Sequence, residues 1–534
     1  MERKRHVRRS AILLLLPLLS SFLPLAQAVT LTINTPSNQT AVVGSAYSLT
    51  ISSAGGTGGN QFAIATGTLP SGLTLNSSTG EISGNPTASQ SNAITVRVTD
   101  NSSATATTSS FTINTGWMVS SIAGTAGVAA ESGIGGQATS ASFDPHGISI
   151  HPDGTIYFTD ATTYRINKID VNGVLSTVMT ASTTVTGIVV RENGDIFFNT
   201  YGGTNRIQKY TAATQTTAVW SSSDTAFSQA RGAISDSAGI IYVADAGTHR
   251  IKKFALNGTM SVLGGNGSAS SSGDDGLATS AAINYPGDVA ADSQGNLYLT
   301  ELNSPRIRKI APDGKIYKVL GDSTSLYSGD GGLATNARTA GVWGVAVDGA
   351  DNIFFVEKGG TAVRRIDAQT GIVTRVAGTG SSGVNGSPIN GISSIATFSN
   401  LVMAIRFDRQ GNLFIVDYSN KQIRKIAGIG APFTTVAPTL TFGSVSNVLK
   451  GLITNLATTA SATGKVTFFA NGKRIPGCIG KSATGSAPIT VNCSWKPSKM
   501  GGIEVRAVLT PTSDPQNPVA TSLYLTVARR TTNR

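Results

Sequence analysis

The stretch "GAISDSAGIIYVADAGTHRIKKF" (residues 232–254) decides the fold, because five more segments of the chain follow its pattern. Each copy begins with an alternating apolar segment and a polar turn with glycine. An apolar run, usually ending on an acid, and a basic segment similar to "RIKKF" follow. Alternation with a period of two residues predicts β-strands. The other copies are residues 147–169, 187–210, 288–310, 344–366 and 404–426.

The length of the repeat indicates the architecture. A further alternating segment follows each of the first five copies, so each unit is predicted to hold four short antiparallel strands. Four-stranded sheets that recur about every 40–60 residues are typical of propeller blades. The sequence therefore predicts an all-β protein with a six-bladed β-propeller.

The segment "VSSIAGTAG" (residues 119–127) precedes the first copy but has the sequence of a fourth strand. The sixth copy lacks a fourth strand of its own. We therefore expect residues 119–123 to pair beside residues 422–427 as the outer strand of the last blade. This pairing would close the ring and remove exposed sheet edges.

The six copies resemble the NHL repeat, whose units read much like "GVAVDSxGNLYVADxxNxRIxKI". The resemblance covers residues 117–430 and departs from the pattern at Asn199, in the acid position, and at Ala362 and Gln422, in the arginine position. It implies an NHL-type six-bladed propeller.

The flanking segments resemble two other families. The stretch "LPSGLTLNSSTGEISGNPT" (residues 69–87) is similar to the bacterial putative-Ig, cadherin-like family, and "GKVTFFANGKRI" (residues 464–475) is similar to bacterial Ig-like repeats. Both resemblances imply β-sandwiches, expected on one side of the propeller rim. The predicted domains are an Ig-like domain at 29–116, the propeller at 117–430 and a second Ig-like domain at 431–534.

Residues 1–28 have the pattern of a signal peptide. A basic start ("MERKRHVRR") precedes an apolar run and the small-residue site Ala26-Gln27-Ala28. We expect an exported protein, whether secreted, periplasmic or on the cell surface. No transmembrane segment is predicted in the mature chain, which we expect to be a monomer.

The net charge of +12 is concentrated at the two ends of the chain. Residues 430–534 carry eleven lysines and arginines against two acids, whereas the predicted propeller is nearly balanced. A neutral propeller is a poor phosphate-binding surface, so no nucleic-acid partner is expected. Cys478 and Cys493 are the two cysteines of the chain, and in an exported protein they predict a disulfide.

Acids and arginines recur five residues apart, one at each end of a tight turn, in copies one, three and four. We interpret them as ion pairs that clamp each turn rather than as a ring of charge that gathers a ligand. The predicted structural turn pairs are Asp160 with Arg165, Asp245 with Arg250, and Glu301 with Arg306.

The starts of the innermost strands are the positions where propeller ligands usually bind. Alignment of the copies places His146, Thr186, Arg231, Gly287, Trp343 and Met403 there. None of these residues is a carboxylate, and no Ser–His–Asp order or phosphate-binding glycine motif is recognisable. We therefore assign no catalytic or cofactor-binding residue and favour a non-enzymatic protein.

The connections before copies one, four, five and six are about twenty residues long and are expected on one face, as a wall that contacts a partner. Two of them contain "GDDG" and "GDGG", where Asp274, Asp275 and Asp330 either form turns or bind calcium. Turn formation is the simpler interpretation, and no other metal or cofactor is predicted.

These observations predict an exported, non-catalytic binding or scaffold protein whose propeller face recognises a protein or polysaccharide of the cell envelope. One alternative is a secreted propeller hydrolase or lyase, similar to lactonases, that acts on sugars or lactones. A second alternative is a structural component of the envelope.

Overall fold

The structure is a computed structural model that describes residues 29–527 apart from short gaps. The gaps are residues 202–205, 222–226, 237–238, 323, 360–361, 381–389, 432–439, 443–447, 450–453, 461–463, 471–472, 476, 484–488, 496–500 and 512–518. The predicted signal peptide lies outside the described residues. Within them the chain forms β-strands and single-turn 3₁₀ helices, and no helix is long and apolar enough to cross a membrane. The 3₁₀ helices are η1 (Ala138–Ser140), η2 (Ala246–Thr248), η3 (Ala334–Asn336) and η4 (Tyr418–Asn420).

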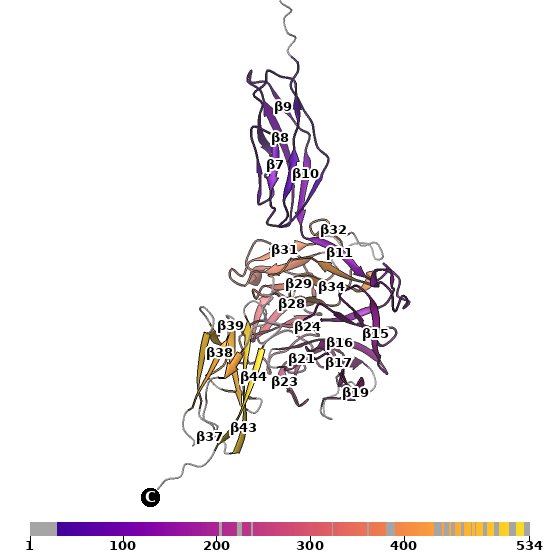
Figure 1. Cartoon of the computed structure of the whole chain (residues 1–534), viewed down its shortest axis with the longest axis vertical. Helices are drawn as coiled ribbons and strands as arrows, with labels where there is room; N and C mark the ends of the chain where they lie inside the picture. Colours follow the sequence, from indigo (N-terminus) through magenta and orange to yellow (C-terminus); the bar gives the residue numbers. More distant parts are fainter. Residues whose placement is uncertain are drawn as a thin grey trace, which may run out of the picture.

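The first module is an Ig-like β-sandwich, which lies at the top of Figure 1. Its strands are β1 (Thr32–Ile33), β2 (Gln39–Val42), β3 (Tyr47–Thr50), β4 (Ser53–Ala54), β5 (Gln61–Thr66), β6 (Leu73–Leu75), β7 (Glu81–Gly84), β8 (Gln90–Thr99), β9 (Thr105–Thr107) and β10 (Phe111–Gly116). One sheet has the order β2-β10-β8-β5, with β9 on β8, and another has the order β3-β7-β6. Alternate residues of these strands, including Ile82, Ile94 and Phe111, form a shared core.

Five sheets of four strands follow, each with its strands in chain order. The first two are β12 (Pro145–Ile150), β13 (Ile156–Asp160), β14 (Arg165–Ile169), β15 (Leu175–Thr180), and β16 (Thr184–Val190), β17 (Ile196–Tyr201), β18 (Ile207–Thr211), β19 (Thr216–Val219). The next two are β20 (Ala230–Ser235), β21 (Ile241–Asp245), β22 (Arg250–Phe254), β23 (Met260–Gly264), and β24 (Pro286–Ala291), β25 (Leu297–Glu301), β26 (Arg306–Ile310), β27 (Ile316–Leu320). The fifth is β28 (Val342–Val347), β29 (Ile353–Glu357), β30 (Val363–Ile366), β31 (Val373–Ala377). The predicted four-strand unit is therefore present in the first five copies.

The last sheet combines two distant parts of the chain. Its strand order is β32 (Gly391–Ile392), β11 (Met118–Ala123), β35 (Gln422–Ile426), β34 (Leu413–Asp417) and β33 (Ile405–Phe407). Strand β11 is antiparallel to β35, with Val119 opposite Ile426 and Ser120 opposite Lys425. This pairing agrees with the sequence prediction. One detail differs: β11 is not the outermost strand, because β32 pairs with its other edge.

Neighbouring sheets pack face to face around shared cores. The innermost strands contact one another in the order β12, β16, β20, β24, β28 and β33, and β33 also contacts β12. The last and first sheets share a core that includes Phe414 and Phe158, while the fifth and last share one that includes Phe354 and Val119. This is the arrangement of a β-propeller.

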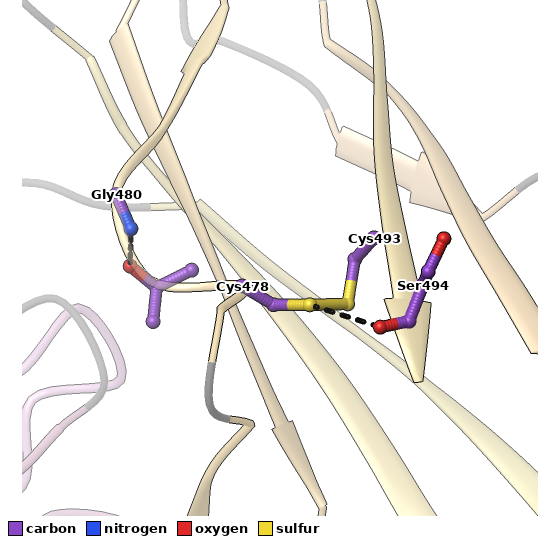
Figure 2. Close-up of a disulfide and its surroundings, with 5 residues drawn as sticks. Cys478, Gly480, Cys493 and Ser494 are labelled. Atoms are coloured by element: carbon purple, nitrogen blue, oxygen red, sulfur yellow. Dashed lines mark hydrogen bonds between the residues drawn. A yellow bond between two sulfur atoms is a disulfide. The ribbon is translucent and has the colours of Figure 1, made fainter. Parts of the chain in front are cut away.

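The C-terminal module is a second group of sheets. Its strands are β36 (Leu440–Phe442), β37 (Val448–Leu449), β38 (Thr454–Ala460), β39 (Gly464–Ala470), β40 (Lys473–Arg474), β41 (Lys481–Ala483), β42 (Ile489–Trp495), β43 (Gly501–Pro511) and β44 (Val519–Val527). One sheet has the order β36-β38-β42 and the other β37-β44-β43-β39-β40, with β41 on β39. The predicted disulfide is present: Cys478, in the segment after β40, is bonded to Cys493 on β42 (Figure 2). It links segments of the two sheets.

The two flanking modules contact different parts of the propeller, which corrects the expectation that both lie on one side of its rim. The first module lies against β32, where Ser89 and Ser393 are hydrogen-bonded at 3.1 Å. In the C-terminal module, Phe469 and Val508 belong to a core shared with strands of the third and fourth sheets. Figure 1 shows the C-terminal module beside β23 and β24.

The predicted turn clamps are wrong. Asp245 binds Lys252, seven residues on, at 2.7 Å, and Glu301 binds Arg308 at 3.4 Å, while Asp160 accepts hydrogen bonds from turn amides such as that of Thr162. The same spacing of seven recurs in Glu357 with Arg364 and Asp417 with Arg424. These diagonal neighbours across a strand pair are buried, and a buried charge needs a partner more than an exposed one does.

The arginines of the predicted clamps point instead towards the long connections. Arg165 binds Glu131, and Arg306 binds Asp274 at 3.3 Å. Arg250 donates a hydrogen bond to the carbonyl oxygen of Asn266 at 3.2 Å. Each arginine therefore fastens a connection to its sheet.

Replacing Arg250 with alanine is expected to lower the free energy of unfolding by less than about 1 kcal/mol, because its hydrogen bond is exposed. Replacing Lys252 with alanine is expected to cost several times more, since Asp245 would be left buried without its cation. Chemical denaturation of both variants measures the difference. Equal losses would restore the turn-clamp interpretation.

Candidate ligand-binding site

One end of the central channel gathers the residues that the sequence analysis placed there. His146, Thr186, Arg231, Gly287, Trp343 and Met403 all line a single cavity of about 20 Å³. A cavity of this size holds about one or two water-sized groups. The structure thus brings all six predicted mouth residues together.

A β-bulge at the start of the innermost strand in the first five sheets explains why five of these six residues face the channel. In the first sheet Pro145 is opposite Asp160 but Ile148 is opposite Phe158, so the inner strand holds one extra residue. The same shift occurs in the next four sheets. A bulge re-aims the side chain within it. In the third sheet this residue is Arg231.

A glycine beside each of several mouth residues lets the sheets approach closely. A Cβ atom on Gly232 would lie 2.1 Å from Oδ1 of Asp288, and one on Gly147 would lie 2.0 Å from the carbonyl oxygen of Thr186. Both distances are far below van der Waals contact. The glycine after the mouth residue therefore allows neighbouring inner strands to approach closely, and the channel is narrow at this end.

Arg231 is the central charge of this mouth. Its guanidinium carbon lies 5.3 Å from the ring centre of Tyr285 and 5.6 Å from that of Trp343, within the range of cation–π attraction. Its Nε atom and the Nε1 atom of Trp343 are buried and have no hydrogen-bond partner. Unsatisfied buried donors are rare in folded proteins. Two of them thus line one small cavity.

The other charges near the mouth are neutralised by neighbours. Asp144 binds the Lys421 ammonium at 2.5 Å, and that ammonium also lies 4.0 Å from the ring centre of Tyr418. Tyr285 is fixed from two sides, because its hydroxyl donates to Gln229 and its backbone N–H donates to Nδ1 of His249 at 3.1 Å. Among the described residues, Arg231 has no acidic partner in an ion pair.

His146 is held in its neutral form. Burial lowers the pKa of His146 to about 4, and the positive charge of Arg231 acts in the same direction, while Asp144 opposes the shift. The imidazole therefore has one ring nitrogen free of a proton at neutral pH. It adds polarity to the mouth without adding charge.

This shift makes stability depend on pH. Between about pH 6.5 and pH 4 the unfolded chain binds a proton at His146 and the folded chain does not, so stability falls as the pH falls. The full loss is about 3 kcal/mol below pH 4. Denaturation of the wild type and His146→Gln at pH 7 and pH 4 measures it, and the variant is expected to lose less stability. Equal losses in both proteins would contradict this assignment.

An ion pair fills the channel below the mouth. Arg406, from the last sheet, reaches across to Asp288 of the fourth sheet, and two guanidinium nitrogens bind the two carboxylate oxygens at 2.9 Å each. Asp288 also accepts hydrogen bonds from the backbone N–H groups of Val289 and Val345. Arg406 lines both the mouth cavity and a second cavity on the opposite side of the ion pair. The pair therefore divides the channel.

The second cavity, of about 430 Å³, lies at the opposite end of the channel and was not predicted. Its walls are the ends of β12, β16, β20 and β33 and the turns after them. Arg409 and Glu192 form an ion pair at 3.1 Å across its rim. In the sequence this end of the repeats consists of glycine-containing turns, which are typical of connections between strands and do not indicate a cavity.

The predicted calcium ligands do not converge. Asp274 binds Arg308 at 2.8 Å, and Asp330, in the next long connection, binds Arg364 at 2.9 Å. Asp275 has a left-handed backbone with φ of 66°, and its N–H donates to the carbonyl oxygen of Ile316. No group of three or more potential metal ligands occurs within the described part of the chain. The structure thus gives Asp274 and Asp330 arginine partners.

The long connections are part of the sheets' packing rather than a free wall. Ala278 and Ile283, in the connection before the fourth sheet, are fully buried in a core with Ile310 and Ile316. Ala334, in the next connection, is buried in a core with Val373. Removal of these connections would open hydrophobic cores, which makes them poor candidates for a detachable binding surface.

Comparison with known protein families gives matches for residues 29–196. Residues 29–116 match the family model described as "Putative Ig domain", and residues 114–196 match the Teneurin NHL domain. The chain therefore contains an Ig-like segment followed by an NHL segment, in agreement with the resemblances found in the sequence.

Several solved structures are similar to this chain at low identity. A structural genomics protein of unknown function from Bacteroides thetaiotaomicron VPI-5482 is 20% identical, with a TM-score of 0.49 over 74% of this chain and 98% of that one. An auxiliary nutrient binding protein from the same organism is 16% identical, with a TM-score of 0.47 over 74% and 97%. Virginiamycin B lyase from Staphylococcus aureus is 16% identical, with a TM-score of 0.37 over 53% and 94%.

Proposed function

We propose that this chain is an exported, non-catalytic binding protein whose ligand site is the channel mouth around Arg231 and Trp343. The signal peptide at residues 1–28 would direct export, and residues 117–430 would form a closed six-bladed propeller between two Ig-like modules at 29–116 and 431–534. The mature protein would act as a monomer at the cell envelope. Its partner would be a polysaccharide or protein of that envelope.

The pair of unpartnered donors at the mouth carries this proposal. Nε of Arg231 and Nε1 of Trp343 are buried beside a small cavity, so a ligand that accepts hydrogen bonds there would satisfy both. The half-buried ring of Trp343 lines the same cavity. The half-buried ring of Tyr285 lies 5.3 Å from the guanidinium carbon of Arg231, and that of Tyr418 lies 6.0 Å from the ring of His146. Pockets that combine aromatic walls with a few fixed polar groups are typical ligand sites.

Binding to immobilised envelope polysaccharides and proteins of defined composition tests the proposal. The purified protein is expected to bind at least one of them. Arg231→Met is expected to weaken that binding at least tenfold, and Trp343→Phe about three- to tenfold. Arg409→Met, at the other end of the channel, is the matched control and should bind normally. Loss in the control alone would move the site to the second cavity. Release of a cleaved product would favour the hydrolase or lyase alternative.

A further inference from the structure

We infer that the group bound at the mouth is a carboxylate carried by a sugar ring, that is, a sugar acid of the uronate type. This inference rests on the proposed function, because it names the ligand class of the same site. It follows from the charge, the donor geometry and the aromatic residues of the mouth.

The net charge of the mouth is +1 and is carried by Arg231. Arg231 has no acidic partner among the described residues, the Asp144 charge is compensated by Lys421, and Asp288 is bound to Arg406. A single uncompensated guanidinium in a partly buried site attracts a single negative charge. Ligands with two or more charges, such as phosphates, are usually bound by clusters of arginine or lysine.

The donors fit a planar anion. A guanidinium offers a fork of donors that matches the two oxygens of a carboxylate, and the unpartnered Nε of Arg231 belongs to that fork. Nε1 of Trp343 supplies another donor at the same cavity. The cavity admits a small group such as a carboxylate, while the rest of the ligand must stay outside.

The surroundings favour a sugar over a peptide. A peptide C-terminus is commonly held by successive backbone N–H groups, and acidic peptides by arginine clusters. Here the unpartnered donors are side chains, and the half-buried ring of Trp343 lines the cavity. The half-buried rings of Tyr285 and Tyr418 lie next to two other mouth residues, Arg231 and His146. Aromatic faces provide flat apolar surfaces for the C–H face of a pyranose ring, next to a polar group that fixes its orientation.

A comparison of oligogalacturonate with oligogalactose isolates the carboxylate, because the two sugars differ at that group. Calorimetric titration of the full-length mature protein is expected to show at least tenfold tighter binding of oligogalacturonate. Arg231→Met should remove this preference, and Trp343→Phe, which keeps an aromatic ring but not the Nε1 donor, should reduce affinity about three- to tenfold. Arg409→Met is the control, and thermal unfolding verifies that each variant is folded.

The outcomes distinguish an error in the ligand class from an error in the position of the binding site. Equal affinity for both sugars, lost in Arg231→Met, would overturn the carboxylate assignment but leave the mouth as the binding site. Binding of a short peptide through its free C-terminus, with no binding of oligogalacturonate, would overturn the sugar assignment. Binding that neither mouth variant changes would overturn both the sugar-acid assignment and the mouth as the binding site. The same holds if the protein binds none of these probes and none of the envelope polymers.

Discussion

Replacing Asp288 with alanine is expected to lower the free energy of unfolding by about 3 to 5 kcal/mol, because Arg406 would remain in the channel without its carboxylate. The exposed fractions of the two side chains are 1% for Asp288 and 13% for Arg406. The arginine also donates hydrogen bonds to the carbonyl oxygens of Ala233 and Ile405. The pair therefore connects the third, fourth and last sheets across the axis.

A double variant shows whether the loss comes from an unpaired charge. In Asp288→Ala/Arg406→Met both charges are absent, and a buried ion pair can often be replaced by apolar groups at little cost. The double variant is thus expected to be more stable than Asp288→Ala. Urea denaturation monitored by tryptophan fluorescence provides both values. A single variant that loses less than about 1 kcal/mol would show that water reaches the guanidinium and that the channel is not divided.

Both residues of this ion pair depart from the repeat pattern in the sequence. Asp288 stands where the first, second, third and fifth copies have glycine, and Arg406 stands where the equivalent residues are Ser149, Val189 and similar small or apolar side chains. A search for residues that the copies share does not reveal residues that occur in one copy alone. Two opposite charges at unusual positions in different copies are a signal that a ring of sheets can bring them together.

The repeat period was enough to predict the strands, because every copy repeats the same alternation. The partner of β11 was predictable for the same reason: one strand was missing at the end of the repeats and one was extra at the start. The mouth residues followed from alignment of the copies. These features depend on local pattern and on equivalence between units, which one sequence can provide.

Side-chain partners within a sheet and contacts between units were less predictable. The spacing of five between acid and arginine was visible, but Arg250 and Lys252 share one face of their strand, and only burial determines that Asp245 binds the lysine. The docking of Phe469 and Val508 on the third and fourth sheets depends on residues outside any repeat. The second cavity likewise depends on how the turns of four sheets are arranged around the axis.

Replacing Val119 with aspartate is expected to unfold the last sheet, with a loss of more than about 4 kcal/mol, because an ionised carboxylate would enter a dry core. Val119 is fully buried and lies in a cluster with Phe398, Ile415 and Ile426. Its strand, β11, separates β35 from β32, so its release would expose the edge of β35.

Ser120→Asp is the matched control for this strand. Ser120 neighbours Val119 on β11 but is exposed, so the same new charge should change stability by less than about 0.5 kcal/mol. Denaturation curves and limited proteolysis of both variants measure the effect. Val119→Asp is expected to become sensitive to proteolysis throughout the propeller, because the last sheet shares cores with both the first and the fifth. Sensitivity confined to the first Ig-like module would mean that β11 belongs to that module and does not hold the propeller together.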